Sequence, residues 1–338
     1  MAPDILLFVA GAALAWLTLL DVFETVIVPG GSRASLKVAK RLIWALLPVW
    51  KAARGKQRGL SGAFAPLVLV LCFITWMALL ALGFALMAYA VRADFRPPLH
   101  SFFDGFYIVG SSLVTVGLAE STPFGFARWV VLAAGFCGLA VMTMAVTYLL
   151  EVQSSVAKRD IGIIKLNTTA GEPPSAVTLL QRFAAIGSRD ELRDVLHNGR
   201  DWCATVRQSH ANHPSLIYFQ SVGTGSGWPA ALGALLDLAL ICEHLIDEPS
   251  LNGSAMLLRE EGTRMARELA GVINLKPEEV APDEPQLRQA ADRLAGSYPI
   301  RPQVNFDTIA GQRVIYQSCV DALARHLGKA RTVLVRQD

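Results

Sequence analysis

Three long apolar runs lie in the first half of the chain, at residues 5–28, 64–91 and 126–152. Each is about as long as a helix must be to cross a hydrocarbon core of ~30 Å. The first run lacks a basic segment before it and a small-residue cleavage signal after it, so we interpret it as a retained helix and not as a signal peptide. The pattern therefore predicts three membrane-spanning helices.

A fourth apolar stretch, residues 101–120, is too interrupted to be another spanning helix. It reads SFFDGFYIVGSSLVTVGLAE, in which Ser101 and Asp104 match the capping box that begins a helix. The helical part, residues 102–113, would be roughly 18 Å long at ~1.5 Å per residue, little more than half of the hydrocarbon core. Residues 115–117 continue a helix poorly. Extended backbone at membrane depth must be surrounded by protein or by an aqueous pore, so this stretch predicts a re-entrant half-helix followed by a loop.

The loop after this half-helix carries a signature. It consists of Thr115, Val116, Gly117, Leu118, Ala119 and Glu120, and it resembles the T-V-G-Y-G-D signature of potassium-channel selectivity filters. The tripeptide T-V-G alone is a weak signal, but its place between a capped half-helix and a full apolar helix is more specific. The resemblance covers roughly residues 60–152. From the residues alone, a further spanning helix with a chance T-V-G is the alternative.

The resemblance implies both a mechanism and an assembly. In that family four loops direct backbone carbonyls at a central axis and replace the hydration shell of the ion. It implies a homotetramer in a lipid bilayer, with K+ as the permeant ion, Na+ left open and no cofactor. The implied filter residues are Val114, Thr115, Val116, Gly117, Leu118 and Ala119, with Glu120 at the outer mouth. Candidates for lining the inner cavity, for which ordinary helix packing is the alternative, are Met142, Thr143, Val146, Thr147 and Leu150.

Two positions depart from the family's signature. Leu118 lacks the hydroxyl by which the family's tyrosine is held against the pore helix. Ala119 stands where the family has a glycine in a left-handed conformation, which would cost alanine roughly 1–2 kcal/mol. We therefore expect a relaxed outer filter, and a weakly selective cation channel is an alternative to a potassium-selective one. A further alternative, from another class, is a non-conducting membrane sensor or scaffold that reuses the pore fold.

A basic segment separates the first two apolar runs. Residues 31–60 contain no acid and eight basic residues, namely Arg33, Lys37, Lys40, Arg41, Lys51, Arg54, Lys56 and Arg58. Apolar residues recur between them at helical spacing, which predicts a basic amphipathic helix in contact with anionic lipid at 33–58, kinked at Pro48. The positive-inside rule places this segment in the cytoplasm and the N-terminus outside. A position between two spans argues against binding to nucleic acid.

Two acids, Asp21 and Glu24, share one face near the end of the first apolar run. Carboxylates in a membrane are costly and are usually paired. We interpret them as paired with the basic segment or exposed at the lipid interface, and a proton or ion sensor is the alternative.

The second half of the chain reads as a soluble helical domain. No strand alternates with its helices, so a doubly wound nucleotide-binding module is not predicted. Residues 223–227 are glycine-rich but lack a preceding strand and a Walker lysine. His210 and His213 have no clear set of partners for a metal. A loose similarity to the helical C-terminal domain of some bacterial two-helix channel proteins, with no ligand assigned, rests on Trp202, Ser209, His210, Pro214, Tyr218, Phe219, Ser226 and Trp228.

Composition and charge complete the picture. The chain has 338 residues, of which 53% are hydrophobic, and a net charge of +3. Five scattered cysteines form no C-x-x-C pair, which favours reduced thiols facing the cytosol. Lys158, Arg159 and Lys165 follow the last apolar run and also favour a cytoplasmic second half. No nucleophile–base set or cluster with metal-ligand spacing is present, so an enzyme is not predicted.

The prediction is an all-α, multi-pass protein of the cell (inner) membrane. It divides into an N-terminal transmembrane helix (1–30), a basic amphipathic helix (31–60), a pore domain (61–152), a linker (153–173) and a cytosolic α-helical domain (174–338). The predicted function is a tetrameric cation channel that is gated or modulated by its C-terminal domain.

Overall fold

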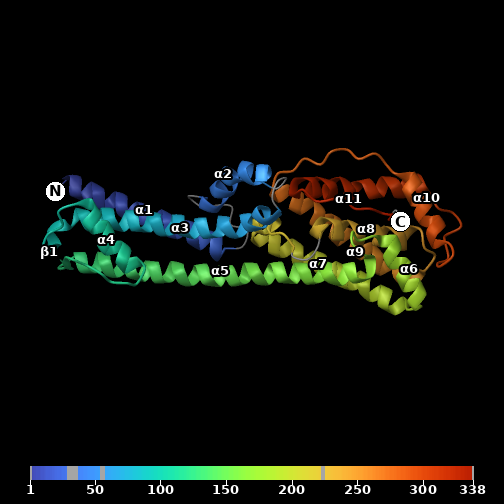
Figure 1. The fold of residues 1–338 in the computed structure, drawn as a ribbon, viewed down its shortest axis with the longest axis horizontal. Helices are drawn as coiled ribbons and strands as arrows, with labels where there is room; N and C mark the ends of the chain where they lie inside the picture. The colour runs from blue at the N-terminus through green and yellow to red at the C-terminus, as the bar shows by residue number, and fades with distance from the viewer. Residues whose placement is uncertain (1, 29–36, 54–57, 222–224, 337–338) are drawn as a thin grey trace. The chain divides into compact units, whose positions relative to one another are not determined.

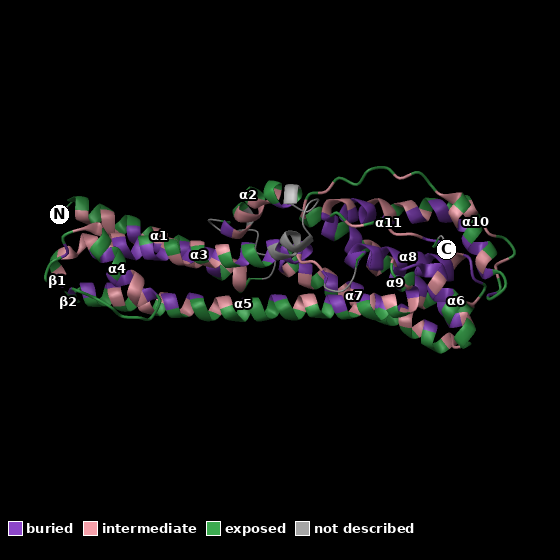
Figure 2. Ribbon diagram, viewed as in Figure 1, coloured by how far each residue is buried: buried purple, intermediate pink, exposed green. Residues whose placement is uncertain are grey.

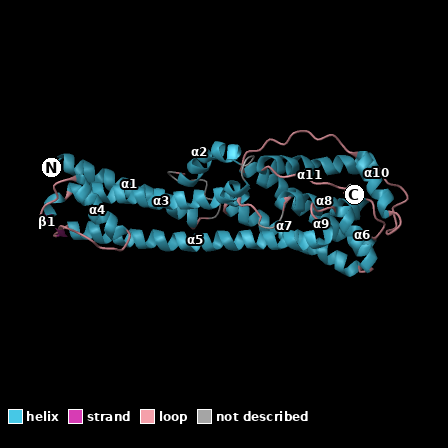
Figure 3. Cartoon of the chain, viewed as in Figure 1, coloured by secondary structure: helices cyan, strands magenta, loops and turns pink. Residues whose placement is uncertain are grey.

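The computed structural model describes residues 2–28, 37–53, 58–221 and 225–336. The chain divides into two compact units, Met1–Val152 and Gln153–Asp338. The described part is almost entirely helical, as Figure 3 shows, and its only named strands are two short ones in the first unit. The predicted all-α class is therefore confirmed.

The first unit contains the apolar helices (Figure 1). They are α1 (Ala2–Val26), α2 (Val38–Ala53), α3 (Arg58–Ala90), α4 (Phe102–Leu113) and the first part of α5 (Ala127–Ala170). Helices α1, α3 and α5 are long and apolar enough to cross a membrane. The three apolar runs are thus confirmed as helices of spanning length.

One boundary differs from the prediction. Residues 153–170, expected to be part of a linker, continue α5 without a break, because no glycine-proline signal interrupts the helix before Gly171 and Pro173. Within the basic segment, α2 includes Pro48, while residues 31–36 and 54–57 lie outside the described residues.

The core of the first unit lies along α3. Trp76, Leu80 and Phe84 are buried in one cluster together with Val22 of α1 and Val109 of α4. The apolar residues of α3 recur on several faces, so the helix can contact α1 on one side and α4 on another. Helix α3 is therefore the element that positions the half-helix.

Two short strands join the ends of the predicted re-entrant stretch. Strand β1 (Phe95–Arg96) follows the 3-10 helix η1 (Arg92–Asp94), and β2 (Thr122–Pro123) precedes α5. They pair antiparallel, with Phe95 opposite Pro123. Because residues before and after α4 are hydrogen-bonded to each other, the chain enters and leaves this stretch at the same end, as a re-entrant segment must.

Asp21 of α1 is buried, and it is not exposed at a lipid interface. Its carboxylate accepts hydrogen bonds from the backbone N–H groups of Lys37 (2.6 Å) and Val38 (3.3 Å) and from Nε1 of Trp76 (2.8 Å). The expected pairing with the basic segment is thus made through its backbone. Since Val38 begins α2, a carboxylate at this end is favoured by the helix dipole and fixes the first turn of α2.

The second unit is a bundle around one central helix. Its elements are the last part of α5, α6 (Ala176–Ile186), α7 (Arg189–Asn212), η2 (Pro214–Tyr218), α8 (Gly227–His244), α9 (Pro249–Val272), α10 (Glu284–Leu294) and α11 (Phe306–Leu327). Sixteen of the eighteen residues of α8 are buried, so it is apolar on every face and is packed by its neighbours, as Figure 2 shows.

A charged network lies inside this bundle. Asp237 of α8 is 1% exposed and receives hydrogen bonds from Arg313 Nε (2.8 Å), Arg313 Nη2 (2.9 Å) and the hydroxyl of Tyr316 (2.7 Å). Burial and the neighbouring Asp237 carboxylate raise the pKa of Tyr316, so its hydroxyl stays protonated and donates. The network fixes α8 against α11.

Candidate ion-conduction site

The half-helix α4 begins as the sequence predicts. Ser101 Oγ accepts a hydrogen bond from the N–H of Asp104 (3.2 Å), and the Asp104 carboxylate accepts one from the N–H of Ser101 (2.9 Å). This reciprocal capping box satisfies two backbone donors that a helix start leaves open. The helix covers residues 102–113 and ends there, which confirms the predicted half-length helix.

The last turn of α4 is fixed against α5 by two glycines. A Cβ atom at Gly138 would lie 2.0 Å from the carbonyl oxygen of Leu113, and one at Gly135 would lie 3.0 Å from Ser112 Oγ. Ser112 Oγ also donates a hydrogen bond to the carbonyl of Val131 (3.0 Å). These glycines let α5 pack closely against α4, and they set where α4 delivers the loop.

The loop turns at Thr115 and Gly117, which have φ values of 60° and 74°. A left-handed conformation costs a threonine roughly 1–2 kcal/mol and costs glycine little. Ala119 does not have a positive φ, so it avoids the cost that the family's left-handed conformation would impose on an alanine. The reversal of the chain is made earlier, next to the end of α4, and leaves Ala119 in an ordinary conformation.

Ser111 holds the loop to α4, a role that the sequence analysis missed. Its backbone carbonyl accepts hydrogen bonds from the N–H groups of Val116 (2.8 Å) and Gly117 (3.2 Å). Its Oγ lies 2.5 Å from the carbonyl oxygen of Leu118 and 2.9 Å from that of Ile108. A hydroxyl in the last turn of an otherwise apolar half-helix was the available signal.

Residues 67–154 match the family model described as "Ion channel". The match covers about a quarter of the chain and includes α4, the loop and most of α3. This part of the chain is an ion-channel domain of the potassium-channel-like pore family. No curated protein and no solved structure matches the chain.

The candidate filter of the ion-channel domain is exposed in the single chain. All residues from 114 to 120 are exposed, with exposed fractions of 59% for Val116 and 56% for Leu118. Apolar side chains with this exposure, at the tip of a half-helix and beside an apolar α5, are typical of a surface that is covered in an assembly.

The five cavity candidates share one face of α5. Met142, Thr143, Val146, Thr147 and Leu150 are all exposed, whereas Val141, Tyr148 and Val152 on the other side of the helix are buried. The hydroxyls of Thr143 and Thr147 donate to the carbonyls of residues 139 and 143, one turn earlier (2.9 and 3.1 Å). Each threonine therefore keeps its lone pairs available on the exposed face.

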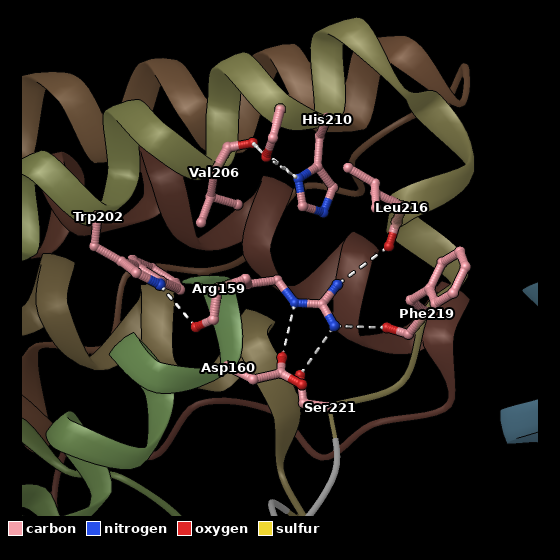
Figure 4. Close-up of polar contacts among 9 residues, drawn as sticks. Arg159, Asp160, Trp202, Val206, His210, Leu216, Phe219 and Ser221 are labelled. Carbon is pink, nitrogen blue, oxygen red and sulfur yellow. Dashed lines mark hydrogen bonds and ion pairs between the residues drawn. The ribbon is translucent and has the colours of Figure 1, made fainter. Parts of the chain in front are cut away.

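In the second unit, Arg159 is buried and is not a solvated flanking charge (Figure 4). Its Nη1 donates to the carbonyl of Leu216 (3.1 Å), and its Nη2 donates to the carbonyl of Phe219 (2.9 Å) and to Ser221 Oγ (3.2 Å). Its Nε pairs with Asp160 at 3.1 Å. A segment of α5 is thereby fixed to η2 and the loop after it.

Several residues of the proposed C-terminal resemblance surround this arginine. Trp202 Nε1 donates to the backbone carbonyl of Arg159 (2.9 Å), and the rings of His210 and Trp228 lie 5.9 Å apart. Burial, and then the nearby arginine, lower the pKa of His210 to about 3, so the imidazole is neutral near pH 7. Its Nδ1 lies 2.8 Å from the carbonyl of Val206, which fixes the proton on Nδ1.

The residues that the structure describes contain no group of three or more His, Cys, Asp or Glu side chains that could hold a metal ion. His210 and His213 are both buried. Of the glycine-rich stretch 223–227, residues 223 and 224 lie outside the described residues, and Ser226 N–H donates to Glu172 Oε1 (2.8 Å).

Proposed function

We propose that four copies of this chain form a potassium-channel-like cation channel, with the loop at 114–119 as its filter. The observation that carries the proposal is the capped half-helix α4, which ends on α5 and delivers an exposed loop at its C-terminal end. The paired strands β1 and β2 support a re-entrant path for this segment.

A tetramer is proposed because one chain leaves the loop incomplete. Extended backbone at membrane depth is tolerated only where protein or water surrounds it. The exposed apolar residues on α5, which include Trp129, Phe136 and Val146, need lipid or other copies to cover them. Four loops around one axis would enclose the backbone and leave water only along the axis.

The ion would be held by backbone dipoles. Carbonyls of Val114, Thr115, Val116 and Gly117 would replace water around K+, and the exposed face of α5 would line the inner cavity. The C-terminal end of α4 carries about half a negative charge, which favours a cation near the loop. Glu120 at the outer mouth would raise the local concentration of cations.

The second unit would modulate opening. Helix α5 is continuous from Ala127 to Ala170, so its exposed cavity face and the buried Arg159 lie on one helix. A change at η2 that loosens the contacts of Arg159 with Leu216 and Phe219 would alter how α5 is held. The gating stimulus would act on η2 and the segment that follows it.

The membrane orientation proposed is an outside N-terminus and cytoplasmic basic segment and second unit, in the cell (inner) membrane. In α2, Trp44 is 79% exposed and Arg41 and Lys51 are basic, a composition that suits an interface with anionic lipid. Cys203 and Cys319 are buried, so the labelling test uses conditions that unfold the second unit and leave the membrane intact. Labelling of either cysteine in intact cells by an impermeant thiol reagent would contradict this orientation.

The test is ion flux through the full-length protein reconstituted in liposomes with K+ and Na+ gradients. The proposal expects cation flux, and a chain shortened after Glu172 should still conduct, with an altered open probability. Absence of flux from a correctly assembled wild-type protein would contradict the channel and favour a non-conducting sensor or scaffold.

A further inference from the structure

The outer end of the loop is tied back to α4 by a single residue. Ser111 contacts three consecutive loop residues, through its carbonyl to Val116 and Gly117 and through its hydroxyl to Leu118. The 2.5 Å separation between Ser111 Oγ and the Leu118 carbonyl oxygen is at the short end of the range for a hydroxyl donor. The Leu118 carbonyl therefore faces the half-helix.

We propose that Ser111 is a selectivity-determining residue, because its hydroxyl holds the Leu118 carbonyl against α4 and removes it from the ion path. The inference rests on the proposed function and deepens it. In a tetramer the loss is one ring of four carbonyl ligands at the outer end of the filter. The remaining ligands are the carbonyls nearer the end of α4.

Peptide geometry makes the effect larger than the loss of a ligand. The peptide bond between Leu118 and Ala119 is trans, since the described cis bonds are Arg96–Pro97 and Glu172–Pro173. In a planar trans peptide the N–H points opposite to the carbonyl. The N–H of Ala119 therefore points away from α4, and a cation at this level would meet a donor in place of an acceptor.

Residues 118 and 119 do not themselves hold the Leu118 carbonyl in place. Leu118 has no polar group with which to hold the loop, and Ala119 has no positive φ that would turn the carbonyl outward. The hydroxyl of Ser111 has one proton and two carbonyls within reach, those of Leu118 and Ile108. Ser111→Ala removes this hydroxyl and with it the bond to Leu118, while the hydrogen bonds from Val116 and Gly117 to the backbone carbonyl of residue 111 do not involve the side chain.

The experiment compares the permeability ratio of K+ to Na+ in planar bilayers for the full-length wild type, Ser111→Ala, Ser111→Thr and Thr75→Ala. Ser111→Ala frees the Leu118 carbonyl, so the ratio should rise by about threefold to tenfold, the range that one hydrogen bond supports. Ser111→Thr keeps the hydroxyl and should match the wild type. Thr75→Ala is the matched control, because the Thr75 hydroxyl donates to the carbonyl of Leu71 within α3 (2.7 Å) and not to the loop or to α5.

A second readout does not depend on conduction. The 13C shift of the Leu118 carbonyl should be the same in K+ and Na+ for the wild type, and it should differ between the two ions in Ser111→Ala. The inference is overturned if Ser111→Ala conducts with an unchanged ratio, or if the wild-type Leu118 carbonyl responds to K+. If the wild type assembles and does not conduct, the proposed function fails. The wild-type measurement shows this independently of the Ser111 variants.

Discussion

The end of α4 and the centre of the second unit differ in how much of their surface is covered by the chain itself. Helix α8 is enclosed by its own chain, and even its charged residue Asp237 finds Arg313 and Tyr316. The loop after α4 and the outer face of α5 are exposed, although both are largely apolar. A region that is complete within one chain is stabilised by its own contacts, whereas the proposed channel would be completed by lipid and further copies of the chain.

The largest effect should follow from breaking the contact between α4 and α5. Gly138→Leu places side-chain atoms where the Leu113 carbonyl lies, because even a Cβ would be 2.0 Å from that oxygen. We expect loss of flux and of the tetramer, measured by liposome assay and native mass. Gly110→Ala is the matched control, since a Cβ there meets nothing within 4 Å. Normal flux in Gly138→Leu would show that this contact does not position the loop.

The next effect concerns the second unit alone. Asp237→Ala leaves Arg313 buried without its carboxylate, which typically costs about 3–5 kcal/mol. We expect the second unit to unfold at a lower urea concentration. The unfolding is measured by the hydrogen exchange of the amides of α8 and α11. Asp307→Ala is a suitable control on the first turn of α11. A second unit of unchanged stability would mean that the network contributes little.

The stability of the second unit should also depend on pH through His210. The pKa of this histidine is about 3 in the folded chain, below the usual ~6.5, so the unfolded chain binds the proton more readily. Stability is complete above pH ~6.5 and falls toward pH 3, by at most about 1.4 kcal/mol per pH unit. His210→Gln should flatten this slope in urea titrations, and His197→Gln on the exposed side of α7 should not. Equal slopes in all three proteins would contradict the assignment.

The smallest effect is expected from Ala119→Gly. Ala119 has no positive φ, so glycine relieves no strain there and adds only flexibility, worth less than about 1 kcal/mol. The reversal potential under a K+ and Na+ gradient should equal that of the wild type. A clear shift toward K+ would show that the outer filter adopts the left-handed conformation of the family during conduction.

Local patterns were enough to predict the helices of spanning length and the capping box of Ser101 and Asp104. Each of these depends on composition or on residues a few positions apart. The contact of Asp21 with Trp76 and that of Arg159 with Ser221 could not be predicted, because these partners lie 55 and 62 residues away in the chain. The role of Ser111 depends on how the loop folds back, and a sequence motif does not specify that turn.

The central claim is that copies of the chain complete the exposed loop and the α5 face. The most direct test is the native mass of the full-length protein extracted into lipid nanodiscs. The account predicts four chains of 36.5 kDa in one particle. A clean monomer or dimer that remains active in its membrane would contradict it.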